Sequence, residues 1–165
     1  MDFMSDALAH GRKFRVLKVI DLYTRESLAI RVDARFTSGQ VVKVLEEVAL
    51  TRGAPLTLRA DNGPEFTARM LDLWAYLNGV TPDFSRPGKP TDNAYIESFN
   101  GRFREECLSQ HYFTSIDDAR RTAELWRVDY NERCPHGALG DLAPGEFAGS
   151  QAGRKGPRPI AKLSL

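Results

Sequence analysis

The sequence predicts an α/β fold with a mixed five-stranded sheet, in which three antiparallel strands come first and parallel strands are added after them, with helices on both faces. Three observations support this prediction. Three segments with the period-two pattern of strands open the chain, and strands that alternate with amphipathic helices follow them. One early segment is also apolar on both of its faces, which is typical of a strand covered by helices on both sides.

The first strands come from residues 1–33. The stretch MDFMSDAL contains the first of them, and residues 14–24 form the second. In this second strand one apolar face is made by Phe14, Val16, Ile20 and Leu22. The third strand covers residues 27–33, and the short link Thr24-Arg25-Glu26 before it suits a hairpin. These strands are therefore expected to be antiparallel.

Helices and strands alternate in the rest of the chain. Ser38 is expected to cap a helix that ends at Gly53, and a strand runs from Pro55 to Asp61. The next helix has its apolar stripe at Phe66, Met70, Leu73, Trp74 and Leu77. A short strand at 80–85, an irregular loop at 85–95, a helix from about 93 to 109 and a last helix from Ser115 complete the pattern.

Composition excludes several classes of protein. No apolar run approaches the roughly 18 residues that span a bilayer, and the first residues carry no signal-peptide pattern. Cys107 and Cys134 are too few for a disulfide framework and lack metal-ligand spacing, which favours a reducing cytosolic setting. The net charge of +1 does not by itself predict nucleic acid. We expect one domain over residues 1–148 and a basic, disordered tail over 149–165.

Asp61 is a candidate functional residue because it stands where a buried strand stops. Leu58 and Ala60 alternate with polar residues up to Asp61, and Asn62, Gly63 and Pro64 then break the strand. Ligands of open α/β sheets bind at the carboxyl ends of strands. The alternative is an ordinary turn in which Asp61 caps the next helix, and this stretch alone favours the turn.

Three further acids are candidates on weaker grounds. Glu97 shares a helix face with Asn100 and Arg104, beside the expected core stripe Ile96, Phe99, Phe103 and Cys107. A solvated helix face with a favourable charge near its N-terminus explains that pattern equally well. Asp2 would share one face of the first strand with Met4 and Asp6, and the alternative is that it belongs to a ragged, charged N-terminus. Asp21 ends an apolar strand before a turn, so a structural role is favoured for it.

Several segments match a known family in their order and spacing. They are MDFMSDAL, FRVLKVIDLYTRE, RADNGPEF, SRPGKPTDNAYIESFNGRFREECL, and WRVDYNERCPHGALG with PGEF after it, and 35 residues separate Asp61 from Glu97. On these segments the chain resembles the DDE transposase and retroviral integrase superfamily, which has a ribonuclease H-like fold. It resembles most the second-frame product of an IS-three family insertion sequence.

The resemblance implies a catalytic and metal-binding triad of Asp2, Asp61 and Glu97. Two Mg²⁺ or Mn²⁺ ions are expected, because hard cations prefer carboxylate oxygens and two ions can stabilise the attacking and leaving oxygens of a phosphodiester. The implied reaction is hydrolysis at the element's end, followed by attack of the freed 3′-hydroxyl on another phosphodiester.

The resemblance also implies partners. DNA, as insertion-sequence ends and target, is expected to contact Arg86, Lys89, Asn93, Asn100 and Arg104, while Asn62 and Gly63 shape the site. We expect a homo-oligomer on DNA, no membrane association, and a bacterial cytoplasmic protein that lies on the nucleoid when DNA is bound.

The sequence departs from the family pattern in two places. Only Met1 precedes Asp2, whereas the family's first strand starts several residues earlier, after an N-terminal region that binds the element's ends. Cys134 stands where the family usually has Arg before Pro-His. We therefore expect a core with a shortened first strand. A ribonuclease H-like nuclease and a catalytically impaired, DNA-binding or oligomerising remnant are the alternative functions.

Overall fold

The fold combines five strands with helices on two sides, as predicted. The computed structural model describes residues 1–60, 63, 66, 69–84 and 94–152. The strands are β1 (Asp2–Ala7), β2 (Lys13–Ile20), β3 (Ser27–Asp33), β4 (Thr57–Ala60) and β5 (Thr81–Phe84). The helices are α1 (Ser38–Arg52), α2 (Arg69–Asn78), α3 (Ala94–Glu106), α4 (Ile116–Arg133) and α5 (Pro144–Ala152), with 3-10 turns η2 (Leu108–Gln110) and η3 (Gly137–Leu139). No helix among these residues is long and apolar enough to cross a membrane.

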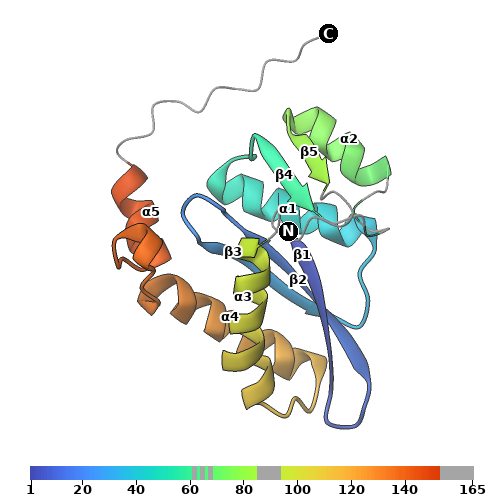
Figure 1. Ribbon diagram of the computed structural model, residues 1–165. Coiled ribbons are helices and arrows are strands. Elements are labelled where there is room, and N and C mark those ends of the chain that lie inside the picture. Colours follow the sequence, from blue (N-terminus) through green and yellow to red (C-terminus); the bar gives the residue numbers. More distant parts are fainter. Residues whose placement is uncertain (61–62, 64–65, 67–68, 85–93, 153–165) are drawn as a thin grey trace.

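The strands form two hydrogen-bonded pieces. An antiparallel sheet has the order β1-β2-β3, and a parallel pair joins β4 to β5. The two pieces meet at the start of β1, where the N-terminal ammonium of Met1 donates a 2.6 Å hydrogen bond to the carbonyl of Arg59 in β4. In Figure 1 the N-terminus accordingly lies beside the end of β4. Within the described residues the strands thus form two hydrogen-bonded sheets that adjoin at the start of β1, rather than the one continuous five-stranded sheet that the sequence predicts.

Two apolar cores lie on opposite faces of β2. Leu17 and Val19 pack with α1, β4 and α2, whereas Phe14, Val16 and Ile20 pack with α3 and α4. Because successive side chains of a strand point to opposite faces, this division follows directly from the period-two pattern. Figure 1 shows the same division, with α1 and α2 near β4 and β5 and with α3 and α4 in the lower half of the view.

The outer edge of β3 is closed by side chains of α4. Asn131 exchanges hydrogen bonds with both backbone groups of Ser27, and Arg120 donates to the carbonyl of Val32 at 2.8 Å. Arg127 also donates to the carbonyl of Ser27 at 2.9 Å. Unpaired backbone groups on an edge strand invite pairing with another chain, so these bonds protect the edge.

The second strand is shorter than predicted. β2 ends at Ile20, and the Asp21 carboxylate accepts hydrogen bonds from the backbone N–H groups of Tyr23 and Thr24 at 2.8 and 3.2 Å. Side-chain bonding of this kind competes with strand pairing, which is why the strand stops four residues early. Asp21 has the structural role that the sequence favours, and Leu22 and Tyr23 are exposed.

Two helix predictions are wrong in detail. Thr37, not Ser38, caps α1, because its hydroxyl accepts from the backbone N–H of Gln40 while the Gln40 side chain accepts from Thr37 N–H.

The buried residues of α2 are Leu71, Trp74 and Ala75, rather than the predicted stripe. Of that stripe, only the two bulky aromatic residues are buried, and the exposed ones are Met70, Leu73 and Leu77. Phe66 lies outside α2, which spans Arg69–Asn78, so it is not part of the helix's buried face.

The chain has one helix more than predicted at its C-terminal end, because α5 follows the helix from Ser115 that was expected to be the last. Ser115 caps α4 as predicted, accepting from the backbone N–H of Asp118 at 3.1 Å. The predicted domain boundary at residue 148 falls inside α5, which continues to Ala152. Residues 153–165, which make up most of the predicted tail, lie outside the described residues.

Candidate active site

Asp2 is placed by the pairing of the first two strands. It stands at the start of β1 directly opposite Lys18 of β2. In the same register Met4 faces Val16, so Asp2 lies on the face of the sheet that α3 and α4 cover. Its side chain is 18% exposed, which leaves the carboxylate reachable from solvent at the rim of the core.

A closed hydrogen-bond network joins Asp2 to α3. Asn100 donates from Nδ2 to Asp2 Oδ2 at 2.6 Å and accepts at Oδ1 from Lys18 Nζ, also at 2.6 Å. Lys18 Nζ lies 3.4 Å from the same Asp2 oxygen. Three elements, β1, β2 and α3, are therefore connected by three side chains at one point.

Lys18 is the charged group at the bottom of this network. Its side chain is fully buried. Burial lowers the pKa of Lys18 to about 8, against the attraction of Asp2, and the nearby charge of Arg104 lowers it further. The amine donates a hydrogen bond to Asn100 and lies against the Asp2 carboxylate, so as an ammonium it balances that negative charge inside the protein.

Helix α3 turns the predicted polar face toward β1. Phe99 and Phe103 anchor the helix in the core through edge contacts with Trp126, with ring centroids 5.5 and 5.0 Å apart. Beside this buried stripe, Arg104 Nη2 donates to the carbonyl of Ser5 in β1 at 3.4 Å, which is at the long limit for a hydrogen bond. Asn100 and Arg104 thus bring one face of α3 against the strand that carries Asp2.

Glu97 belongs to the same face of α3. It precedes Asn100 by three residues, a spacing that makes side chains neighbours on a helix surface. Its side chain is exposed. The helix face on which the sequence predicts an acid, an amide and a guanidinium therefore contacts β1 through its amide, Asn100, and its guanidinium, Arg104.

Other sequence-predicted site residues are not described. Asp61 and Asn62 lie outside the described residues, as do Arg86, Lys89 and Asn93. Of the chain around Asp61, Ala60 ends β4 as a buried residue, and Gly63 accepts at its carbonyl from the N–H of Phe66 at 2.9 Å. Within the described part of the chain, no three His, Cys, Asp or Glu side chains gather as a metal site. Because Asp61 lies outside the described residues, only Asp2 and Glu97 of the three predicted ligands can be located. Both supply the carboxylate oxygens that Mg²⁺ prefers.

Lys18 was missed by reasoning from the sequence. The pattern contained a signal, because Lys18 interrupts the apolar row Phe14, Val16 and Ile20 on one face of β2. A buried lysine almost always has a charged partner. A lysine in the middle of an apolar strand face therefore predicts an acid on the neighbouring strand.

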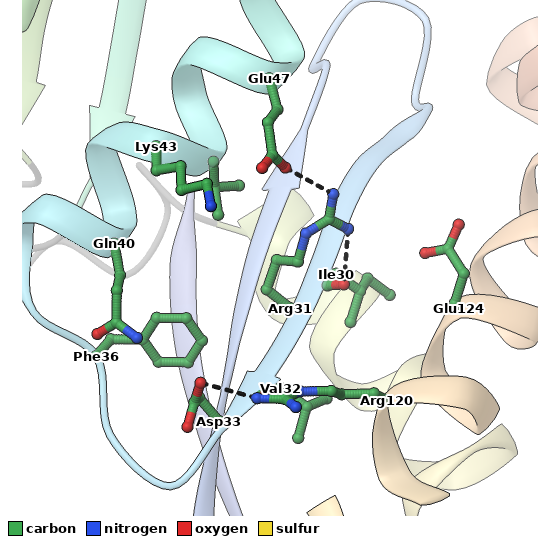
Figure 2. A pocket seen from close by; sticks show the side chains of 11 residues that line it. Ile30, Arg31, Val32, Asp33, Phe36, Gln40, Lys43, Glu47, Arg120 and Glu124 are labelled. Atoms are coloured by element: carbon green, nitrogen blue, oxygen red, sulfur yellow. Dashed lines mark hydrogen bonds and ion pairs between the residues drawn. The ribbon is translucent and has the colours of Figure 1, made fainter. Parts of the chain in front are cut away.

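A cavity of about 530 Å³ lies elsewhere, along β3 between α1 and α4 (Figure 2). Four of its charged residues form two ion pairs: Arg31 with Glu47 at 3.0 Å, and Arg120 with Asp33 at 2.9 Å. None of Asp2, Glu97 and Asn100 lines it. The cavity is therefore separate from the carboxylate site.

Comparison with known proteins assigns the family. Models of the integrase core domain match residues 1–90 and 78–144. The chain is 52% identical over 148 residues to an uncharacterized 31.7 kDa protein of insertion element IS407 from Burkholderia multivorans. This alignment covers 90% of the present chain and 53% of that protein. It is 47% identical over 148 residues to an uncharacterized 39.2 kDa protein of insertion element IS476 from Xanthomonas euvesicatoria, covering 90% and 43%. The chain therefore spans about half the length of these relatives.

The fold agrees with this assignment. The catalytic core domain of BIV integrase superposes with a TM-score of 0.66 over 93% of this chain and 95% of that one, at 19% identity. That likeness establishes a ribonuclease H-like fold. Taken together, the matches show that the chain belongs to the integrase core domain family, within the superfamily of DDE transposases and retroviral integrases.

Proposed function

We propose that this chain is the catalytic core of an insertion-sequence transposase, a polynucleotidyl transferase that hydrolyses a phosphodiester and then transfers a DNA strand. One observation carries the proposal. In a member of the integrase core domain family, the bond from Asn100 to Asp2 holds a strand carboxylate against the helix face that bears Glu97. This bond supports the proposal that Asp2 and Glu97, two of the three acids implied by the resemblance, belong to one site.

In this proposal Asp2, Asp61 and Glu97 hold divalent metal ions. Carboxylate oxygens without thiol or imidazole ligands suit Mg²⁺ or Mn²⁺, and bound ions of this kind stabilise charge on the attacking and leaving oxygens. Asn62 and Gly63 shape the site beside Asp61. Asn100, expected to contact DNA, uses its amide oxygen and one amide hydrogen for Lys18 and Asp2, so we propose that its main part is to orient Asp2.

The reaction needs no covalent protein–DNA bond. Water cleaves a phosphodiester at the element's end and leaves a 3′-hydroxyl, which then attacks a second phosphodiester and releases another 3′-hydroxyl. The second step exchanges one phosphodiester for another and requires no added energy source. We propose that backbone phosphates are bound by Arg104, which contacts Ser5 of β1, and by Arg86, Lys89 and Asn93. We further propose that the protein works as a homo-oligomer on DNA in the bacterial cytoplasm, at the nucleoid.

Joining of DNA strands tests this function. A duplex that carries the terminal repeat of the chain's own element, pre-cut to expose its 3′-hydroxyl, is incubated with a plasmid target in Mg²⁺, in Mn²⁺ and in EDTA. The substitutions Asp61→Asn and Glu97→Gln remove one metal-binding carboxylate each. Glu105→Gln makes the same chemical change at an exposed position of the same helix and serves as the control.

We expect metal-dependent joining by the wild type and the Glu105→Gln protein, and none by the other two. Two outcomes would support the alternatives instead. Metal-dependent nicking without joining would indicate a ribonuclease H-like nuclease. Binding of DNA without any cleavage, in a protein that is folded by circular dichroism, would indicate an impaired remnant.

A further inference from the structure

Lys18 carries a charge at a position of β2 where the strand pattern would place an apolar side chain. It is fully buried on the face of β2 that otherwise holds Phe14, Val16 and Ile20. An apolar residue in its place would fit the strand pattern and avoid the cost of taking an ammonium out of water. A buried ion pair therefore adds little to the free energy of folding compared with an apolar side chain in the same place. The contacts of Lys18 indicate a functional role instead.

The polar contacts of the Lys18 ammonium are with residues of the candidate site. They are the 2.6 Å hydrogen bond to Asn100 Oδ1 and the 3.4 Å contact with Asp2 Oδ2. Asp2 Oδ2 also accepts from Asn100 Nδ2 at 2.6 Å. Among the described residues no hydrogen bond to the other oxygen, Asp2 Oδ1, is recorded, so the network holds one oxygen and leaves the second for another ligand.

We propose that Lys18 is a positioning residue of the candidate site: together with Asn100 it fixes Asp2 through Oδ2, presents Oδ1 to the metal ions, and weakens the binding of those ions by its fixed positive charge. This inference rests on the proposed function. The charge of Lys18 offsets one of the three predicted carboxylate charges. Tight metal binding then requires the further negative charge of a DNA phosphate, so the ions are held firmly only when substrate is present.

Binding of Mn²⁺ to the free protein tests the proposal without an activity measurement. Free Mn²⁺ is followed by electron paramagnetic resonance during titration of the full chain, with no DNA. Lys18→Met removes the charge and keeps a side chain of similar length. Lys18→Gln removes the charge but keeps a hydrogen-bond donor, and it decides the question if the Met protein does not fold. Lys13→Gln makes the same change of charge at the exposed start of the same strand and is the control.

We expect both Lys18 proteins to bind Mn²⁺ at least about tenfold more tightly than the wild type, because the removed charge lay next to a ligand of a divalent ion. Lys13→Gln should match the wild type, and Glu97→Gln should weaken binding. If Glu97→Gln weakens binding while the Lys18 proteins bind no more tightly than the wild type, the inference is wrong and the proposed function stands. If neither the wild type nor the Lys18 proteins bind Mn²⁺, the inference is likewise wrong, because removal of the charge has not strengthened binding, and the strand-joining assay alone then decides the proposed function.

Discussion

Substitution of Asn100 by alanine should destabilise the protein far more than its partly exposed position suggests. The change removes two short hydrogen bonds of 2.6 Å, one to the Asp2 carboxylate and one from the buried Lys18 ammonium. Each bond involves a charged group, and such bonds contribute about 1.5 kcal/mol or more. We therefore expect the free energy of unfolding to fall by about 3 kcal/mol, since two such bonds are lost.

Urea unfolding followed by circular dichroism measures this loss, with Glu105→Ala on the exposed side of α3 as the control. The double variant Lys18→Met with Asn100→Ala should lose less than the two single variants added together, because no buried ammonium is then left without its amide partner. A loss below about 0.5 kcal/mol for Asn100→Ala, the size of an ordinary surface substitution, would contradict the two hydrogen bonds of Asn100 to Asp2 and Lys18.

Three further predictions concern the core and the pH dependence. Cys107 is buried and burial raises its pKa to about 12, so Ellman's reagent at pH 8 should label it only after unfolding, and rapid labelling of the native protein would contradict its placement. Leu71→Ala should cost roughly 3 kcal/mol, whereas Leu77→Ala on the exposed side of the same helix should cost less than about 0.5 kcal/mol. Burial, together with nearby arginines, lowers the pKa of His136 below 6.5, so the unfolded chain takes up the proton first. The free energy of unfolding should accordingly fall as the pH drops below 6.5, and His136→Gln should make that fall smaller, as urea titrations at pH 7.5 and 5.5 would measure.

Much of the fold could be predicted because periodicity reports burial directly. The bounds of β3 at residues 27 and 33 agree with the sequence, and so does the core stripe of α3. The predicted apolar stripe of α2 is wrong because two sets of residues show helical spacing. Met70, Leu73 and Leu77 are exposed, whereas the residues with the same spacing that begin at Leu71 are buried. A pattern shows that a helix has an apolar face, but tertiary packing decides which of two apolar faces is covered.

The candidate site could be predicted only in part from the sequence. Placing Asn100 beside Glu97 needs nothing more than helical spacing, and that prediction agrees with the structure. Linking Asp2 to Asn100 requires contacts between residues 98 positions apart, which no local pattern contains. Lys18 was overlooked for a similar reason, since its partners lie on another strand and on a helix.

The central claim, that three carboxylates hold metal ions for strand transfer, is tested most directly by a change of metal preference at Asp61. The substitution Asp61→Cys replaces a hard oxygen ligand by a soft sulfur ligand of similar reach. The account predicts that this protein joins no DNA strands in Mg²⁺ and recovers joining when Mn²⁺ or Zn²⁺ is supplied, while the wild type is active in Mg²⁺. Joining in Mg²⁺ at the wild-type rate would contradict the account, because Asp61 would then not be a metal ligand.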